Sequence, residues 1–255
     1  MGITLRLGEK VAKIDLLPPE NNGGPHVQAT LASGKSLRAQ TLLYAIGRQG
    51  TTGSLHLDKA GLKSDDRERL KVNEHYQTNV PHIYAAGDVI GFPALASTSM
   101  EQARRAVAHA MEMANGTLSP ILPNGIYTIP EVSMIGETEE SLKKQGIDYV
   151  VGRSTYADNA RGQIIGDKDG FLKLLFRRDD LKLLGVHVIG ELATEVVHIG
   201  LMAMLTGATG NVFVEACFNV PTLGQLYKMA TIAAIREKGG THPQAAPLGM
   251  PVKPS

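Results

Sequence analysis

A glycine and an aspartate near the middle of the chain are the residues best suited to hold a ligand. Residues 83–86 are a short apolar run that predicts a buried strand, and Gly87 and Asp88 end it. Glycine lets the backbone approach a ligand closely, and a carboxylate accepts hydrogen bonds from hydroxyl groups. Residues 96–113 contain no proline or glycine and predict a helix that starts close to Asp88. Its apolar residues can share one side: Ala96, Ala103, Val107, Ala110 and Met111.

Two interpretations of this Gly-Asp pair are open. The unpaired amide groups in the first turn of a helix attract anions and electron-rich rings, so an acid beside a helix amino terminus makes a binding site. Gly-Asp after a strand is also a common turn. The spacing alone does not separate the two interpretations.

A second glycine turn follows residues 41–46, which predict a continuous apolar strand. The strand ends at Gly47 and Arg48. The residues alone favour a glycine turn with a solvated arginine.

Other reactive side chains do not gather into a predicted site. Cys217 is the only cysteine, which excludes an internal disulfide or a multi-cysteine metal site and favours a reducing cytoplasm. It is expected to be a small buried thiol. The 8 histidines are scattered, and His187 and His198 fall on different predicted elements without further ligands at metal-binding spacing, so no metal is expected.

The composition is that of an ordinary globular protein. Of the 255 residues 43% are hydrophobic and 20% charged, and the formal net charge is +1, which gives no electrostatic reason to expect nucleic acid or an anionic membrane as a partner. No apolar run approaches about 20 residues, and the first residues lack the apolar region of a signal peptide. We therefore expect a cytoplasmic protein with no membrane span.

The elements fall into a β-rich opening and a second domain. Residues 3–7, 11–16 and 27–31 predict three short strands, too few for a domain of their own. After the predicted helix, prolines at 120 and 123 mark a break.

The second domain combines predicted strands with helices. The strands are expected at residues 126–129, 132–135, 149–156, 171–176 and 183–189. Thr138 can cap a helix that Gly146 ends, and two further helices are expected over 191–206 and 222–236. This order predicts an antiparallel sheet with helices, an α+β domain. Residues 239–255 are expected to be disordered.

Several of these stretches resemble the pyridine nucleotide-disulfide oxidoreductases. Residues 78–88, a threonine, an apolar run and then Ala-x-Gly-Asp, resemble the second flavin-binding motif of that family. The resemblance implies that Asp88 binds the ribityl chain of FAD, that Gly87 permits close approach and that Ala96 lies near the isoalloxazine ring. It also implies that Gly47 and Arg48 lie near the junction of the NAD(P) and FAD domains.

The resemblance extends to the end of the second domain. Residues 121–238 are similar to the family's dimerisation domain, which implies a homodimer. In disulfide reductases of the family a histidine and a glutamate near its end relay protons, and here Val220 and Gln225 occupy those places. Neither side chain exchanges a proton near neutral pH. This departure, with residues 43–48, 87–97 and 125–131, favours the transhydrogenase members, which pass hydride from NADPH through FAD to NAD.

The resemblance covers only part of such an enzyme. No Gly-x-Gly-x-x-Gly turn for a dinucleotide pyrophosphate occurs. We therefore expect a truncated chain, with an α/β partial FAD/NAD(P)-binding region followed by an α+β dimerisation domain. In the first region, residues 1–77 are a remnant of the NAD(P)-binding domain and its crossover to the FAD domain, and residues 78–120 are the second FAD-binding segment. The dimerisation domain covers residues 121–238.

Two alternatives to a transhydrogenase remain open at this stage. One is a non-catalytic dimerisation module or relic. The other is a reductase like dihydrolipoamide dehydrogenase, which needs a pair of thiols and a histidine at the place of Val220, neither of which this sequence shows.

Overall fold

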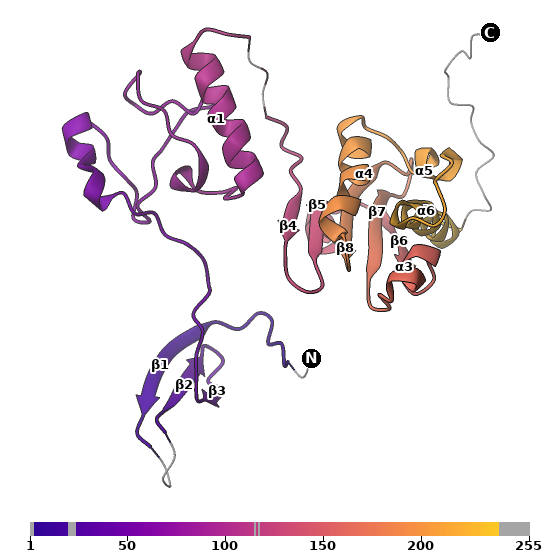
Figure 1. Cartoon of the computed structure of the whole chain (residues 1–255), viewed down its shortest axis with the longest axis horizontal. Coiled ribbons are helices and arrows are strands. Elements are labelled where there is room, and N and C mark those ends of the chain that lie inside the picture. The colour runs from indigo at the N-terminus through magenta and orange to yellow at the C-terminus, as the bar shows by residue number, and fades with distance from the viewer. Residues whose placement is uncertain (1–2, 20–23, 115, 117, 240–255) are drawn as a thin grey trace. The chain divides into compact units, whose positions relative to one another are not determined.

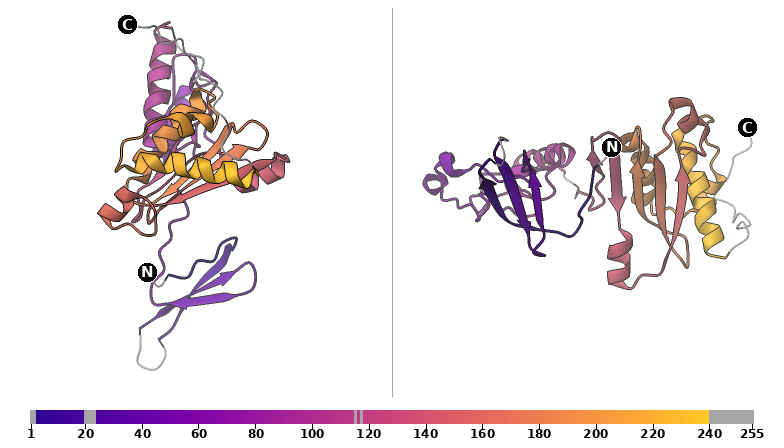
Figure 2. Two further views of the ribbon diagram at one scale, coloured as in Figure 1. Left: turned by 90° about the vertical axis from the view of Figure 1, so that its right-hand side faces the viewer. Right: turned by 90° about the horizontal axis from the view of Figure 1, so that it is seen from below.

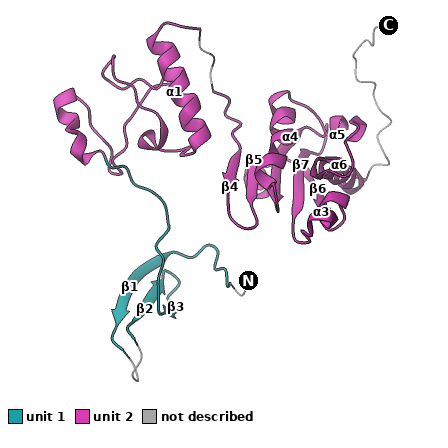
Figure 3. Cartoon of the chain, in the orientation of Figure 1, with its two compact units in different colours: residues 1–51 teal, residues 52–255 magenta. Residues whose placement is uncertain are grey.

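Two units make up the computed structural model, which describes residues 3–19, 24–114, 116 and 118–239 (Figures 1 and 2). The units are residues 1–51 and 52–255 (Figure 3). The predicted disordered tail, apart from Gly239, lies outside the described residues.

The first unit is built on a three-stranded antiparallel sheet in the order β1-β2-β3. The strands are β1 (Val11–Leu17), β2 (His26–Leu31) and β3 (Ser36–Ala39). Leu31 on β2 is buried, and Val11 pairs with it. Two of the three predicted strands are therefore present, and β3 was not predicted.

The predicted strands at residues 3–7 and 41–46 are wrong. Neither stretch is in a strand, and Leu7, Leu43 and Ile46 are exposed. A strand forms only where a neighbouring strand takes up its backbone N–H and C=O groups, and no strand of the described part pairs with these residues. Apolar alternation alone does not reveal whether such a partner exists.

The stretch before the long helix consists of turns rather than strands. It holds three short 3-10 helices, η1 (Gly53–Leu55), η2 (Leu57–Ala60) and η3 (Gly87–Ile90). The predicted strand at 83–86 is wrong, because only a single bridge joins Tyr84 to Gln77. The Thr78 amide donates to the Ile83 carbonyl at 2.9 Å, closing a turn.

The predicted helix is present as α1 (Ala96–Ala110). It starts eight positions after Asp88, because η3 and a loop containing Pro93 intervene. Its buried residues are Thr98, Gln102 and Ala106, so mostly polar side chains face the rest of the unit.

The remainder of the second unit is a five-stranded antiparallel sheet in the order β4-β5-β8-β7-β6. Its strands are β4 (Asn124–Ile126), β5 (Val132–Gly136), β6 (Tyr149–Thr155), β7 (Phe171–Arg177) and β8 (Leu183–Ile189). The helices are α2 (Glu139–Gln145), α3 (Ala160–Ile165), α4 (Ala193–Leu205), α5 (Asn211–Glu215) and α6 (Leu226–Glu237), with the 3-10 turn η4 (Leu223–Gln225).

The predicted ends of α2 are confirmed. The Ser141 amide donates to Thr138 Oγ1 at 3.1 Å, and the Thr138 amide donates to Ser141 Oγ at 2.9 Å. Gly146 ends the helix with a φ of +68°.

Two helices cover the buried face of the sheet. α6 packs on β6 and β7, and α4 packs on β8 and β5 (Figure 1). A Cβ atom at Gly152 would lie 1.9 Å from the Ala230 carbonyl oxygen, so the backbones of β6 and α6 touch directly. The core between them contains the fully buried Leu174, Leu226 and Tyr227.

Candidate functional site

Gly87 has a backbone conformation and a position that only glycine fits well. Its φ is +83°, in the left-handed region. A Cβ atom there would lie 3.1 Å from Ser99 Oγ and 3.3 Å from Ser99 Cβ. The Gly87 amide donates to Gln102 Oε1 at 2.7 Å, so a buried α1 side chain holds this glycine against the helix.

Asp88 is exposed in the first turn of η3, and its carbonyl accepts from the Gly91 amide at 3.0 Å. Gly91 also has a positive φ, +92°, and a Cβ there would lie 3.1 Å from Arg69 Nη1. The structure therefore presents the carboxylate on a short, tightly turned segment between two glycines.

Arg69 is itself fixed by a carboxylate. Its Nε donates to Asp65 Oδ2 at 2.9 Å, and its backbone amide donates to Asp65 Oδ1 at 2.9 Å. These hydrogen bonds lower the pKa of Asp65 to about 2, so it stays ionised at neutral pH. The 65–69 turn thus holds the Arg69 side chain in place against the backbone of Gly91.

The amino terminus of α1 lies beyond the same loop. Leu95 occupies the N-cap position and has no side-chain acceptor for the first-turn amide groups. Thr98 Oγ1 donates to the Pro93 carbonyl at 3.0 Å and to the Leu95 carbonyl at 2.8 Å, which ties the loop to the helix. Ala96 is exposed at this end, and no acidic side chain occupies the first turn.

A second polar tie joins α1 to the same segment. The Tyr84 hydroxyl lies 2.8 Å from His109 Nδ1, and the His109 ring stacks on His75 with centroids 4.2 Å apart. The loop from Tyr84 to Leu95 is thus bonded to both ends of α1. The spacing of these residues does not predict the aromatic cluster, because its members come from two separate segments before the helix and from the helix itself.

The predicted site residues fall into two groups. Gly87, Asp88 and Ala96 lie on one continuous stretch of the second unit. Gly47, with a φ of +138°, and Arg48 are exposed residues of the first unit. The roles predicted for all five residues stay predictions.

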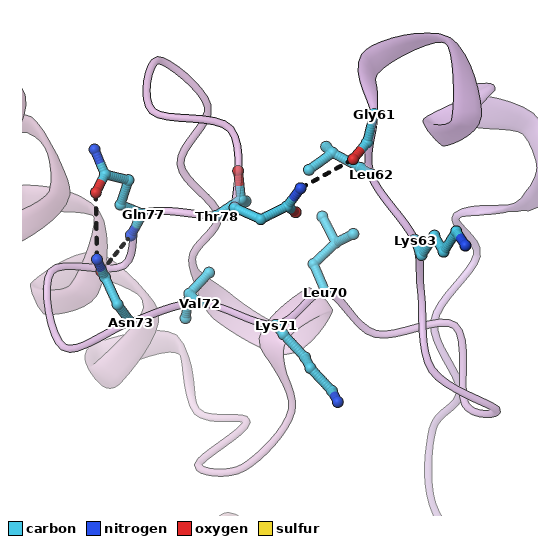
Figure 4. A pocket seen from close by; sticks show the side chains of 10 residues that line it. Gly61, Leu62, Lys63, Leu70, Lys71, Val72, Asn73, Gln77 and Thr78 are labelled. Atoms are coloured by element: carbon cyan, nitrogen blue, oxygen red, sulfur yellow. Dashed lines mark hydrogen bonds between the residues drawn. The ribbon is translucent and has the colours of Figure 1, made fainter.

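A hollow of about 530 Å³ that the sequence did not predict lies beside Thr78. Hydrogen bonds already join residues that line the hollow: Asn79 Nδ2 donates to the Gly61 backbone carbonyl at 3.0 Å, and Asn73 Nδ2 donates to Gln77 Oε1 at 3.2 Å (Figure 4). Lys71 extends away from the apolar lining (Figure 4). The hollow therefore offers shape but few polar groups aimed at a ligand.

Positions 220 and 225, where the resemblance to disulfide reductases predicts a proton-relay pair, carry side chains that do not exchange protons. Val220 is exposed, and Gln225 lies in η4. Cys217 is exposed, so its predicted burial is wrong: Phe213 and Leu223 fill the core at this turn. No group of three or more histidine, cysteine or acidic side chains able to hold a metal ion occurs among the residues that the structure describes.

Comparison with known families matches two stretches of the chain to models of one family. Residues 1–110 match the model described as pyridine nucleotide-disulphide oxidoreductase, and residues 122–231 match the dimerisation domain of the same proteins. The chain belongs to the pyridine nucleotide-disulphide oxidoreductase family, and the predicted fold class is confirmed.

Within the family, its sequence relatives include soluble pyridine nucleotide transhydrogenases. The protein of that name from Mycobacterium bovis (strain BCG / Pasteur 1173P2) is 49% identical over 232 residues, which are 91% of this chain and 48% of the relative. The Serratia proteamaculans protein of that name is 46% identical over 235 residues, 91% of this chain and 49% of the relative. The chain spans about half the length of the curated relatives it matches.

Solved structures support the same fold. The HOCl-induced flavoprotein disulfide reductase RclA from Escherichia coli aligns with a TM-score of 0.74 at 24% identity, over 85% of this chain and 49% of that one. LpdA from Mycobacterium tuberculosis aligns with a TM-score of 0.72 at 23% identity, over 88% of this chain and 48% of that one.

In the described residues, no helix combines the length and apolar character needed to cross a membrane.

Proposed function

We propose that this chain contributes to an FAD-dependent oxidoreductase that passes hydride between NADPH and NAD. The observation that carries the proposal is the Gly87-Asp88 turn, which presents an exposed carboxylate beside a helix amino terminus in a chain 49% identical to a soluble transhydrogenase. The compartment we propose is the cytoplasm, since the sequence holds a single cysteine and no disulfide pair.

The residues present fit a flavin. The positive φ of Gly87 lets the backbone turn tightly against α1, the Asp88 carboxylate can accept hydrogen bonds from ribityl hydroxyls, and the uncapped first turn of α1 can face an electron-rich ring near Ala96. When bound, FAD would supply the redox chemistry, and the chain would orient it and shape its electrostatic surroundings. Gly47 and Arg48 are proposed to lie where the nicotinamide and flavin parts of such an enzyme meet.

The missing acid-base pair supports hydride exchange over disulfide reduction. Val220 and Gln225 cannot carry protons to or from a dithiol. Hydride transfer between two nicotinamide nucleotides does not need such an acid-base pair. The proposed organisation assigns residues 1–77 and 78–120 to the nucleotide-binding part and residues 121–238 to homodimer formation.

The test is flavin retention by the purified chain and two matched variants. Each protein is incubated with excess FAD and desalted, and its absorbance spectrum is recorded. We expect the wild-type chain and Asp66→Ala, an exposed carboxylate in a nearby turn, to retain flavin equally. Asp88→Ala should bind about tenfold more weakly or worse, because its hydrogen bonds from the ribityl hydroxyls are lost. NADPH should then bleach the bound flavin.

One result would contradict the proposal for this chain. A wild-type chain that unfolds cooperatively and forms a dimer, yet takes up no FAD, would identify it as a non-catalytic dimerisation module. That second function is favoured by the match of residues 122–231 to the dimerisation domain and by the half-length coverage of the relatives.

A further inference from the structure

Gln102 is a polar residue on the buried side of helix α1. It is 2% exposed, and the other buried residues of the helix are Thr98 and Ala106. Burying a side-chain amide costs free energy unless its polar atoms are hydrogen-bonded, and an apolar side chain would fill the same space without that cost. The presence of a glutamine here therefore calls for an explanation beyond packing.

The backbone amide of Gly87 needs the acceptor that this glutamine provides. Ala86 is extended, with φ −145° and ψ 158°, and the Ala85 amide donates across to the Tyr76 carbonyl at 3.0 Å. Beyond that pairing, the Gly87 amide donates instead to Gln102 Oε1, at 2.7 Å and 15 positions along the chain. A buried backbone amide without a partner is strongly disfavoured, so this hydrogen bond fixes the direction in which the amide points.

Gly87 does not hold its own conformation. Glycine adopts positive and negative φ about equally readily, so the residue that permits a φ of +83° does not by itself select it. Two contacts from α1 do so. One is the hydrogen bond to Gln102, and the other is Ser99, whose Oγ would lie 3.1 Å from a Cβ atom at Gly87. Ser99 and Gln102 are three positions apart on the same side of the helix.

The place of Asp88 depends on the same hydrogen bond. Peptide units are planar, so a rotation that turns the Gly87 amide away from Gln102 also moves the next residue and its carboxylate. The Gly91 amide donates to the Asp88 carbonyl at 3.0 Å, which shapes η3 internally. The Gln102 hydrogen bond, by contrast, orients the start of η3 relative to α1.

We propose that Gln102 is a positioning residue whose side chain sets the orientation of the Gly87-Asp88 turn and so directs the Asp88 carboxylate to the ribityl hydroxyls of FAD. The inference rests on the flavin role proposed for Asp88. Gln102 acts through Asp88 and not through a contact of its own with the flavin. A residue that only stabilised α1 would affect flavin binding equally with or without the Asp88 carboxylate.

The first experiment measures hydrogen exchange of the Gly87 amide by NMR, without flavin. Gln102→Met keeps a side chain of similar length but removes the acceptor, whereas Gln102→Glu keeps a carbonyl oxygen in the same place. Gln145→Met makes the same change at an exposed position of α2. We expect Gln102→Met to lower the protection of the Gly87 amide about tenfold or more. Gln102→Glu and Gln145→Met should keep the protection of the wild type.

The second experiment measures the dissociation constant for FAD in a double-mutant cycle. Gln102→Met should weaken binding about tenfold, and Gln102→Glu should restore it to within about threefold of the wild type. In the Asp88→Ala background, Gln102→Met should have almost no further effect, because the carboxylate that it misplaces is already absent. Melting temperatures establish that each variant is folded. If Gln102→Met does not fold, Gln102→Asn replaces it, since its amide is one methylene too short to reach Gly87.

Two outcomes would overturn the inference. One is full protection of the Gly87 amide in the folded Gln102→Met chain, since the turn would then be held without this acceptor. The other is an equal loss of FAD affinity in the wild-type and Asp88→Ala backgrounds, which would identify a structural effect that does not pass through Asp88. If the wild-type chain takes up no FAD, the proposed function and the flavin role of Gln102 fail for this chain, whereas the exchange measurement still decides whether Gln102 holds the turn.

Discussion

At the scale of single residues, Tyr227 ties two helices together. It is fully buried on α6, and its hydroxyl donates to the Val196 carbonyl at 3.0 Å and accepts from the Gly200 amide at 3.1 Å, both on α4. Burial raises the pKa of this hydroxyl, so it stays protonated and can serve both bonds at neutral pH.

Tyr227→Phe should lower the free energy of unfolding by about 1–3 kcal/mol, because it removes the donor and leaves the Gly200 amide and the Val196 carbonyl buried without this partner. Urea unfolding followed by circular dichroism measures the change. Tyr127→Phe, at a position that is 80% exposed, provides the matched control and should have almost no effect. Equal effects of the two substitutions would show that the Tyr227 bonds contribute nothing beyond packing.

At the scale of elements, β6 and α6 meet where glycine removes a side chain. A Cβ at Gly152 would lie 1.9 Å from the Ala230 carbonyl oxygen, a backbone atom that cannot move without shifting α6. The close approach lets Val150 and Leu174 on neighbouring strands be fully buried under the helix.

Gly152→Ala should therefore destabilise the chain by about 3 kcal/mol or more, because α6 has to move off the sheet. Gly166→Ala is the control that measures the cost of a left-handed backbone conformation without a steric collision. Gly166 has a φ of +77° but nothing within 4 Å of a Cβ, so only about 1–2 kcal/mol is expected. Thermal and urea unfolding of both variants give the comparison. A Gly152 variant no less stable than the Gly166 variant would mean that α6 is not held against β6.

Elements with a clear local residue pattern could be predicted. The five-stranded sheet alternates apolar and polar residues, and Thr138 and Gly146 carry the local chemistry of helix ends, so β5, β6, β7, β8 and α2 were found close to their observed positions. The short helix α3 was missed because it contains Gly162, which argues against a helix, although Asn159 caps it with bonds to two amide groups.

Other errors share one cause, which is that the sequence does not show which segments pack against one another. Residues 41–46 have the apolar character of a strand, but no strand in the described part pairs with them. The apolar side of α1 was identified from its spacing, while its exposure followed only from the polar bonds of Gln102 and His109. The Gly87-Asp88 turn could be named from its motif, but its support by Ser99 and Arg69 depends on tertiary contacts.

At the scale of the whole molecule, the dimerisation domain has an outward apolar surface on α4. Met202 is 56% exposed there, and Leu205 is exposed one turn further on. The buried side of the same helix packs on β8 and β5, so Met202 lies opposite the core. We expect this side of α4 to be part of the interface of a homodimer.

Met202→Asp should shift the dimer toward monomer by about tenfold or more in dissociation constant, since the interface would bury an unpaired charge. Sedimentation velocity over a dilution series measures this shift, and Lys143→Asp, exposed on α2, should leave it unchanged. A Met202→Asp chain that dimerises like the wild type would place the homodimer interface elsewhere.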